Sequence, residues 1–403
     1  MIIHKSVKML YNRIMKIGIY GGTFDPIHLG HISIAKAVRS ELGLDKLYFV
    51  VAADPPHKPN SERTPAQVRL EMAKITLKNV PGLYASDVEI KRGGKSYTVE
   101  TLAEMKKRYR DSELYFIVGA DMLANFPTWY QPAEILRLAK LVAVQREGQA
   151  EDLPALAEAI KTQFGGEIVI SKACGPEISS TEIRTRIAEA RPIRDITAYK
   201  TELYIYENLL YAPDEILKIR EKLAERLEPM RLRHSLLTAR EAVLLADRHG
   251  LDTKKAYLCG LIHDCAKLKN ELLGETMERL GFVPTEEEKA NPYLIHARLG
   301  VVSAKADFGV DDEEILRAIE LHTLGAPDMT PFDEVIFLAD KLEPSRDYRK
   351  ITPIRTLSRR SLDAATAAVL ENNIAYMRSR EKPIHPTTES TLAAIKGRIK
   401  NKK

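Results

Sequence analysis

Hydrophobic positions follow two different rhythms along the 403-residue chain. Between residue 16 and about residue 210, short apolar runs alternate with amphipathic stretches, such as HISIAKAVRSELG (31–43), that have the 3.6-residue period of a helix. The runs that predict strands are KIGIYGG (16–22), KLYFVVAA (46–53), LYASDVEIK (83–91), ELYFIVGA (113–120), LVAVQRE (141–147) and EIVIS (167–171). This alternation predicts an α/β domain in which helices cover both faces of a parallel sheet.

The strand signal stops after about residue 210, and amphipathic helices follow one another to the end of the chain. Pro213 followed by Asp214 and Glu215 is typical of a helix start. We therefore expect an N-terminal extension at 1–14 outside the fold, an α/β domain at 15–211 and an all-α domain at 213–403.

Composition and charge narrow the class of protein. The net charge is +5, and no long basic run precedes the tail KGRIKNKK (396–403), so a nucleic-acid partner is not expected. No run of 18 apolar residues and no signal-peptide pattern is present, so we expect no membrane span. Three cysteines form no even disulfide framework, which favours a cytoplasmic protein. The sequence leaves the oligomeric state open, a homo-oligomer included.

The first candidate site lies in GIYGGTFDPIHLGH (18–31), where a strand runs through a glycine turn into a helix. Helix N-termini present unpaired N–H groups to phosphates, which explains Gly21 and Gly22. His28 and His31 are three residues apart near the helix start, so their side chains project side by side. Such a pair suits in-line attack on an α-phosphorus, where charge grows on the equatorial oxygens. The alternative for a bare H-x-x-H is a pair that only caps and packs the helix.

Two glycine motifs of nucleotide-binding proteins are missing. The dinucleotide fingerprint G-x-G-x-x-G is absent after the first strand. The stretch GGKS (93–96) fails the P-loop pattern because Glu89 stands where the first glycine is required, so it predicts a hairpin turn.

The stretch 18–31 is similar to the G-x-F-D-P-x-H-x-G-H signature of the nucleotidyltransferase superfamily, and ISSTEIR (178–184) resembles a second element of that superfamily. The resemblance implies a Rossmann-like nucleotidyltransferase fold and binding of ATP with Mg²⁺. It also implies that His28 and His31 are catalytic. The ATP-binding residues that it implies are Gly21, Gly22, Thr23, Phe24, His28, His31, Gly119, Asp121, Ser179, Ser180, Thr181 and Arg184.

Three further stretches resemble the nicotinate mononucleotide adenylyltransferases: DPPHK (54–58), SYTVETL (96–102) and FIVGADMLANFPTWY (116–130). This narrower resemblance covers residues 16–210 and implies that nicotinate mononucleotide is the acceptor. Trp129 is the only tryptophan, and in a polar loop it favours a flat aromatic ligand over the core. The acceptor-binding residues implied are His57, Lys58, Thr98 and Trp129.

The second candidate site is a set of ligand-type residues within apolar helical patterns. These residues are His234, His263, Asp264, His296, His322 and Asp340. An ionised Asp or an inward-facing His in such a pattern is expensive to bury unless it is paired or coordinated. The order H…HD…H…H…D resembles the HD-domain metal phosphohydrolases over 213–385. Four imidazoles and two carboxylates are sufficient for two divalent metal ions, and imidazole-rich ligation favours iron, manganese or zinc over magnesium.

The phrases around these residues, HDCAK, NPYLIHARLG, LHTLG and ADKLEPSR, resemble the symmetrical diadenosine tetraphosphate hydrolases, which use iron and release two ADP. The resemblance implies that Asp264 is catalytic as a bridge between the metal ions. Lys267 and Arg346 are then candidates for binding the polyphosphate, the alternative being that both are exposed cations.

The resulting hypothesis is a bifunctional cytoplasmic enzyme whose partners are small nucleotides: ATP, nicotinate mononucleotide and diadenosine tetraphosphate. One alternative keeps both folds, with phosphopantetheine as acceptor and a signalling nucleotide for the second domain. Another makes the C-terminal half a non-catalytic nucleotide sensor.

Overall fold

The computed structural model describes residues 13–54, 64–146 and 152–401. The chain divides into two compact units. The first contains residues up to Ile183 together with Arg194–Glu202, and the second contains Arg184–Ile193 and Leu203–Lys403. Helices α8 (Ser180–Ala188) and α9 (Tyr199–Glu207) are therefore each divided between the units.

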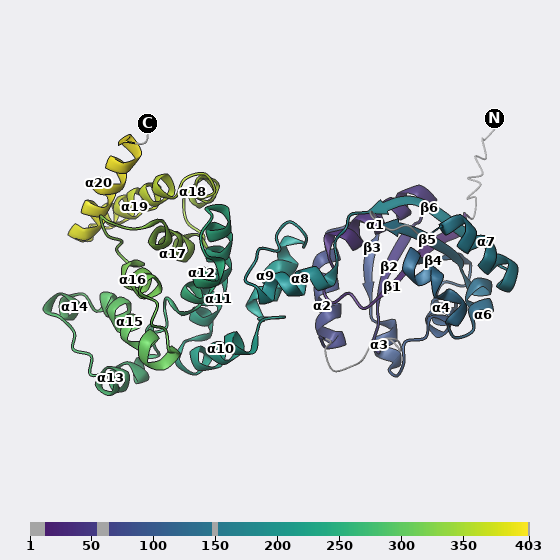
Figure 1. Ribbon diagram of the computed structural model, residues 1–403, viewed down its shortest axis with the longest axis horizontal. Helices are drawn as coiled ribbons and strands as arrows, with labels where there is room; N and C mark the ends of the chain where they lie inside the picture. Colours follow the sequence, from purple (N-terminus) through teal and green to yellow (C-terminus); the bar gives the residue numbers. More distant parts are fainter. Residues whose placement is uncertain (1–12, 55–63, 147–151, 402–403) are drawn as a thin grey trace, which may run out of the picture. The chain divides into compact units, whose positions relative to one another are not determined.

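The first unit is built on a six-stranded parallel sheet with the order β3-β2-β1-β4-β5-β6 (Figure 1). The strands are β1 (Met15–Gly22), β2 (Lys46–Val51), β3 (Leu83–Ser86), β4 (Ser112–Gly119), β5 (Lys140–Arg146) and β6 (Ile168–Gly175). The predicted parallel sheet is confirmed. The strand order reverses between β1 and β4, and in doubly wound sheets ligands bind at the carboxyl ends of the strands beside such a reversal.

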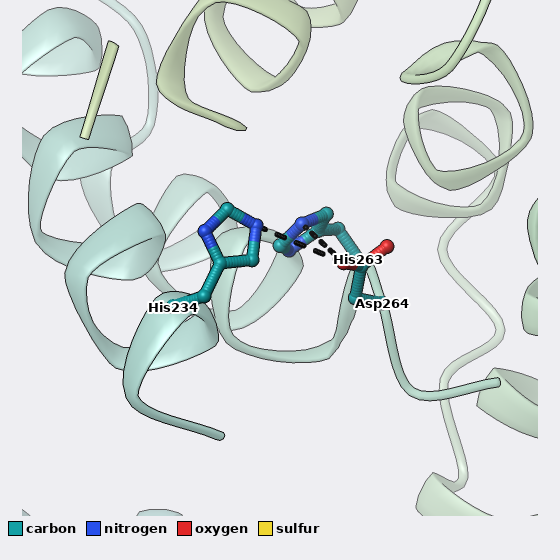
Figure 2. Close-up of side chains that lie close together, drawn as sticks. All are labelled: His234, His263 and Asp264. Atoms are coloured by element: carbon teal, nitrogen blue, oxygen red, sulfur yellow. Dashed lines mark ion pairs between the residues drawn. The ribbon is translucent and has the colours of Figure 1, made fainter. Parts of the chain in front are cut away.

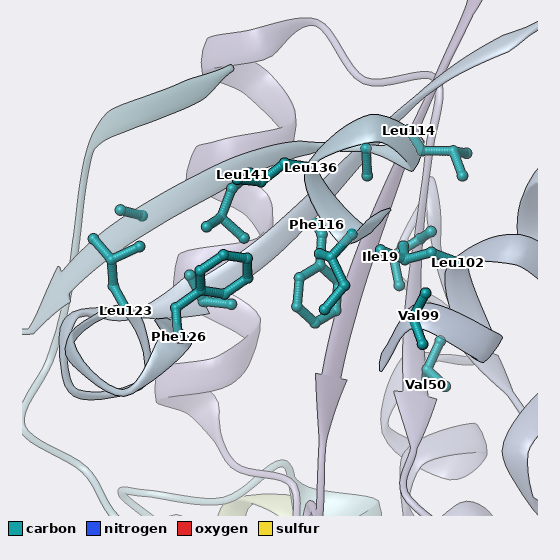
Figure 3. Packing of buried hydrophobic residues seen from close by; sticks show 14 of the residues in the cluster. Ile19, Val50, Val99, Leu102, Leu114, Phe116, Leu123, Phe126, Leu136 and Leu141 are labelled. Atoms are coloured by element: carbon teal, nitrogen blue, oxygen red, sulfur yellow. The ribbon is translucent and has the colours of Figure 1, made fainter. Parts of the chain in front are cut away.

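Helices connect the strands and cover the sheet. They are α1 (Leu29–Leu42), α2 (Ala66–Leu77), α3 (Val88–Arg92), α4 (Thr98–Arg108), α5 (Ala120–Ala124), α6 (Pro132–Leu138) and α7 (Leu153–Phe164), with a 3-10 turn at Phe126–Thr128. Alternate residues of the central strands, Ile19, Phe116 and Leu141 among them, pack with Leu102 of α4 and Leu136 of α6 in one buried cluster (Figure 3). This period of two is the pleat of the strand, and it places the core between these strands and helices.

Two local predictions in this unit are wrong. The strand expected at 83–91 ends at Ser86, and α3 follows because a helical turn buries the adjacent Val88 and Glu89 together. The hairpin expected at GGKS is instead a connection between α3 and α4, in which Gly93 and Gly94 both have φ near +70°. Positive φ values are compatible with either kind of turn, so the glycines alone did not distinguish them.

The described residues of the second unit form helices and no strands. They comprise α10 (Asp214–Arg226), α11 (Pro229–Arg248), α12 (Thr253–Ile262), α13 (Asn270–Arg279), α14 (Glu286–Ala290), α15 (Ile295–Phe308), α16 (Glu313–Leu321), α17 (Pro331–Leu342), α18 (Ile351–Ser358), α19 (Leu362–Ser379) and α20 (Pro386–Asn401). Helix α10 begins directly after Pro213, as predicted. Helix α17 is buried along almost its whole length and packs against α11, α16 and α19, so it forms the centre of this unit.

No helix in the described part of the chain is long and apolar enough to cross a membrane.

Candidate active sites

A cavity of about 740 Å³ opens at the carboxyl ends of the central strands of the first unit. The predicted site residues that line it are Gly21, Gly22, Thr23, Phe24, His31, Thr98, Gly119, Asp121 and Trp129. They come from β1, the turn after it, α1, α4, β4, α5 and the loop after α5, so the fold brings together stretches that are far apart in the sequence. His57 and Lys58 lie outside the described residues.

The two histidines of the first motif lie with their rings against each other at the start of α1, tilted by 31°. His28 precedes the helix in an extended conformation, and its backbone N–H donates to Nδ1 of His31 at 3.3 Å. The ring centroids are 3.6 Å apart, and both side chains are buried. Phe24 meets the His31 ring edge to face, with centroids 5.0 Å apart, which restricts its orientation. Because Nδ1 of His31 accepts a hydrogen bond, the neutral ring carries its proton on Nε2.

Side chains pack closely over the glycine backbone around this cavity. A Cβ on Gly22 would lie 2.8 Å from the Phe24 ring, and one on Gly119 would lie 2.6 Å from Oδ1 of Asp121. Phe24 itself has φ of +50°, a left-handed conformation that costs a non-glycine residue about 1 kcal/mol or more. Only glycine therefore fits at positions 22 and 119 without displacing a residue that lines the cavity.

The second predicted motif begins α8 next to the first. Ser179 Oγ accepts from the backbone N–H of Glu182 at 3.0 Å, so Ser179 caps the helix. Ser180 Oγ donates to the backbone carbonyl of Pro26 at 2.9 Å and links the helix start to the turn after β1. Thr181 lies in the first turn of the helix, while Arg184 on the same helix is grouped with the second unit. The ATP-binding roles of these residues stay predictions.

Sequence reasoning missed Arg69, which supports the same turn. Its guanidinium is 1% exposed and donates to the backbone carbonyls of Thr23 at 2.6 Å and Thr64 at 2.8 Å. The backbone N–H of Thr64 in turn donates to Asp25 Oδ2 at 3.1 Å. The only available signal was an arginine beside Leu70 on the apolar face of a predicted helix.

The other end of the cavity combines an aromatic wall with buried polar groups. The Trp129 ring contacts Phe126 and Phe116, with centroids 5.4 and 6.1 Å apart, and also faces the cavity. Glu89 lines the cavity too, accepts from the Thr101 hydroxyl at 2.6 Å, and has its pKa raised by burial. Trp129 thus packs on the core and is also available to a flat ligand.

In the second unit, five helices or helix ends converge on one cluster of histidines and aspartates. His234 lies on α11, His263 and Asp264 follow α12, His296 lies on α15, His322 follows α16, and Asp340 lies on α17. All six predicted ligands are buried, and their donor atoms form three overlapping groups whose atoms lie within 4.8 Å of one another. The structure thus brings together every residue of the predicted metal set.

Each oxygen of Asp264 faces a different pair of histidines. Oδ2 lies 3.7 Å from Nε2 of His234 and 3.5 Å from Nε2 of His263 (Figure 2). Oδ1 lies 3.6 Å from Nε2 of His296 and 3.2 Å from Nε2 of His322. Oδ1 of Asp340 also faces the first pair of histidines and lies 3.0 Å from Nε2 of His234. A carboxylate placed between two pairs of imidazoles has the arrangement of a bridging ligand for two metal ions.

The Nδ1 atoms of the four imidazole rings also have partners. Three of them donate from Nδ1 to a backbone carbonyl three residues earlier: His263 to Gly260, His296 to Tyr293 and His322 to Ile319, at 2.6–2.8 Å. His234 Nδ1 instead contacts Glu343 Oε1 at 3.1 Å. These bonds leave every Nε2 facing the carboxylates. Nε2 of His263 is buried without a hydrogen-bond partner, which fits a metal ligand.

The protonation states of His263, His296 and Asp264 suit metal binding, whereas Asp340 and Glu343 outweigh burial and raise the pKa of His234. Burial lowers the pKa of His263 to about 3 and that of His296 to about 2, so both are neutral at pH 7. Burial opposes ionisation of Asp264, but His263, Lys267 and His322 outweigh it and hold the pKa of this carboxyl well below its usual value. Neutral imidazoles and ionised carboxylates are the forms that ligate cations.

Four cations surround the two aspartates. The predicted pair is present: Lys267 Nζ lies 3.1 Å from Asp264 Oδ1, and Arg346 Nη2 lies 2.7 Å from Asp340 Oδ1. Arg231, 3.2 Å from Asp264 Oδ2, and Lys341, paired with Asp340, were missed because a cation beside a helical apolar pattern carries no local signal. Lys267 and Arg346 are thus ion-paired and partly buried, and their phosphate-binding role stays a prediction.

Comparison with known proteins separates the same two parts. The cytidylyltransferase-like family matches residues 19–186, and the HD-domain family matches residues 231–345. The fold and the sites thus define an α/β nucleotidyltransferase domain followed by a helical HD domain.

Relatives identify the combination more closely. The chain is 30% identical over 370 residues to a protein of Mycoplasma pneumoniae named probable nicotinate-nucleotide adenylyltransferase/Ap4A hydrolase, an alignment that covers 90% of this chain and 99% of that protein. The probable nicotinate-nucleotide adenylyltransferase of Citrifermentans bemidjiense is 38% identical over 214 residues, covering 49% of this chain and 98% of that protein. The nicotinate-nucleotide adenylyltransferase of Bacillus subtilis is 38% identical over 197 residues, again covering 49% of this chain and 98% of that protein. This chain belongs to the nicotinate-nucleotide adenylyltransferase family, in the form that carries an HD domain.

Proposed function

We propose that this chain is a bifunctional cytoplasmic enzyme. Its first domain transfers an adenylyl group from ATP to nicotinate mononucleotide, giving nicotinate adenine dinucleotide and pyrophosphate. Its second domain hydrolyses diadenosine tetraphosphate (Ap4A) to two ADP. The convergence of His31, Gly119 and Trp129 on one cavity supports the first activity, and the six-residue cluster centred on Asp264 supports the second. We place the domains at 15–211 and 213–403, with 1–14 outside both.

Adenylyl transfer needs positioning and charge stabilisation rather than a covalent intermediate. The acceptor phosphate attacks the α-phosphorus of ATP, which enters as its Mg²⁺ complex, and pyrophosphate leaves on the opposite side. The Nε2–H of His31 donates to an α-phosphate oxygen as its negative charge grows, and His28 supports it. The backbone of Gly21 and Gly22 and the start of α8, with Ser179, Ser180 and Thr181, receive the β- and γ-phosphates, and Arg184 pairs with them.

Acceptor and adenosine occupy the two ends of the cavity in this proposal. Trp129 stacks on the pyridine ring, with Thr98 beside it, and His57 and Lys58 bind the phosphate of the mononucleotide. Gly119 and Asp121 hold the adenosine. Thr98, Gly119, Asp121 and Trp129 line the cavity, which supports these assignments.

In the second domain, His234, His263, Asp264, His296, His322 and Asp340 would hold two divalent metal ions, which supply the Lewis acidity for attack of a water on phosphorus. Asp264 would serve as the bridge between them. Lys267 and Arg346 would bind the polyphosphate. We propose iron as the metal because the motifs resemble those of the symmetrical Ap4A hydrolases, which use iron, and the four imidazoles among the six ligands suit iron, manganese or zinc.

The test of the first activity is incubation of the purified full chain with ATP and either nicotinate mononucleotide or phosphopantetheine, with the products detected by mass. We expect the nicotinate dinucleotide and pyrophosphate. Adenylylated phosphopantetheine as the main product would contradict the proposal.

The second activity is tested with Ap4A and metal analysis of the same preparation. We expect ADP as the single nucleotide product and close to two metal equivalents per chain. One equivalent or fewer, with no hydrolysis of Ap4A, would favour the non-catalytic sensor.

A further inference from the structure

The Nδ1 atoms of the four histidines around Asp264 have partners of two different kinds. His263, His296 and His322 each donate Nδ1–H to a neutral backbone carbonyl within their own helical turn. His234 alone, among the four, contacts a carboxylate, Glu343 Oε1 at 3.1 Å. Glu343 follows the end of α17, three residues after Asp340, and is 0% exposed.

Glu343 is itself held rigidly. The backbone N–H of Ser345 donates to its Oε2 at 2.6 Å, and the Ser345 hydroxyl donates to its Oε1 at 2.5 Å. Arg346 Nε lies 3.6 Å from the same Oε1. A carboxyl group that receives donors from a ring, a hydroxyl and the backbone at once is held as the acceptor-only carboxylate. His234 is thus fixed with Nδ1 toward an anion and Nε2 toward Asp340 and Asp264.

The carboxylates are divided unequally between the two pairs. His234 and His263 lie beside Asp340 and Oδ2 of Asp264, with Glu343 behind. His296 and His322 lie beside Oδ1 of Asp264. Across from Asp264, the neutral hydroxyl of Thr323 lies 3.0 Å from His296 Nε2 and 3.3 Å from His322 Nε2. The number of carboxylates and the support of the ligands both tune metal affinity.

We propose that Glu343 is a positioning residue for His234 and that the two metal positions are unequal. The ion beside His234, His263 and Asp340 binds first and dissociates last, and the ion between His296 and His322 binds more weakly. This inference rests on the metal-binding half of the proposed function and adds to it the order of loading and the residue that sets it.

The test is a titration of the metal-free full-length protein with Mn²⁺ alone, in which free Mn²⁺ is measured by electron paramagnetic resonance. We expect two binding steps whose dissociation constants differ by about tenfold or more. His322→Ala should remove the weak step and keep the tight one. His234→Ala should weaken the tight step, so these two variants assign the steps to their positions.

Glu343→Gln separates charge from shape, because the amide oxygen still accepts from Nδ1 of His234. We expect it to weaken the tight step roughly 10- to 100-fold and to change the weak step much less. The matched control is Glu334→Gln, at a buried glutamate of α17 that contacts Thr366 and Arg398 instead of a metal ligand. Glu334→Gln should leave both steps unchanged. If Glu343 acted only as a buried structural glutamate, the two variants would weaken metal binding alike.

A second variant keeps the proposal testable if Glu343→Gln does not fold. Ser345→Ala keeps the Glu343 carboxylate but removes its hydroxyl donor, so it should weaken the tight step by a smaller factor than Glu343→Gln. Circular dichroism of each metal-free variant reports whether it has folded. Two equal steps in the wild type, or a tight step unchanged in both Glu343→Gln and Ser345→Ala, would overturn the inference.

The outcomes also separate this inference from the proposed function. Absence of any tight Mn²⁺ binding by the wild type would refute the metal centre and the inference together. Two unequal steps without hydrolysis of Ap4A would refute the proposed substrate and leave the inference standing.

Discussion

The backbone N–H of His28 donates to Nδ1 of His31, and the two imidazole rings lie with their centroids 3.6 Å apart. One histidine therefore determines which nitrogen of the other carries the proton. His31 is the member of the pair that lines the cavity. In the proposed reaction, its Nε2–H donates to an α-phosphate oxygen of ATP.

Replacing His31 by alanine removes this donor. We expect His31→Ala to lower kcat for synthesis of the nicotinate dinucleotide roughly 100- to 1,000-fold, because stabilisation of the transition-state charge is lost. Hydrolysis of Ap4A by the same preparation is the control and should not change. Loss of both activities in a protein that remains folded would contradict independent sites.

Asp264→Ala should have the reverse effect. In our proposal this carboxylate would serve both metal positions, so we expect bound metal to fall below one equivalent and hydrolysis of Ap4A to be lost. Synthesis of the nicotinate dinucleotide should continue at the wild-type rate. Elemental analysis and the two assays on one sample measure all three quantities, and a full metal content would disprove the bridge.

Trp129 offers a direct signal because it is the only tryptophan of the chain. Stacking of a pyridine ring on its indole should quench the intrinsic fluorescence when nicotinate mononucleotide is added. Trp129→Phe should raise KM for the mononucleotide more than KM for ATP, since a smaller ring keeps part of the stacking. A fluorescence spectrum that does not respond to saturating mononucleotide would place the acceptor elsewhere.

Arg69 is expected to stabilise the first unit. Its buried guanidinium donates charge-assisted hydrogen bonds to the carbonyls of Thr23 and Thr64, and Arg69→Ala would leave these acceptors without the donor. We expect the free energy of unfolding to fall by about 3 kcal/mol. Urea denaturation followed by Trp129 fluorescence measures it in this unit. The control is Lys74→Ala at an exposed position of the same helix, which should change it by less than about 0.5 kcal/mol.

Asp307 should make the stability of the second unit depend on acid pH. Burial raises its pKa, but Arg279, Arg226 and Ser303 outweigh burial and lower the pKa from its usual value of 3.8 to about 2. The folded pKa is the lower one, so the contribution is complete above about pH 4 and is lost as the pH falls toward 2. The shift corresponds to about 2 kcal/mol at neutral pH.

Asp307→Asn checks this sign. The variant should be less stable than the wild type by about 2 kcal/mol at pH 7, and the difference should shrink as both proteins approach pH 2. Urea unfolding followed by far-ultraviolet circular dichroism measures the difference. A difference in the free energy of unfolding that stays constant from pH 7 to below pH 3 would show that the loss comes from packing rather than from charge.

The sequence by itself determined the features that depend on local pattern. Apolar periodicity separated a parallel α/β half from a helical half, because strand and helix differ in period. Ionisable residues at apolar positions, such as Asp340 after VIFLA, indicated a buried polar cluster, since such groups need partners. The same local rules failed at GGKS, where glycines with positive φ are compatible with a hairpin and with a helix–helix connection alike.

Only the tertiary structure decided which groups support the ligands. His234 and Glu343 are 109 residues apart, and the side chain of Arg69 reaches back 46 residues to Thr23. No periodicity or spacing encodes such pairs, because the contact exists only once separate helices and strands have packed together. The division of Asp264 between two pairs of histidines has the same origin. Four helices must approach from different directions before each oxygen acquires its own neighbours.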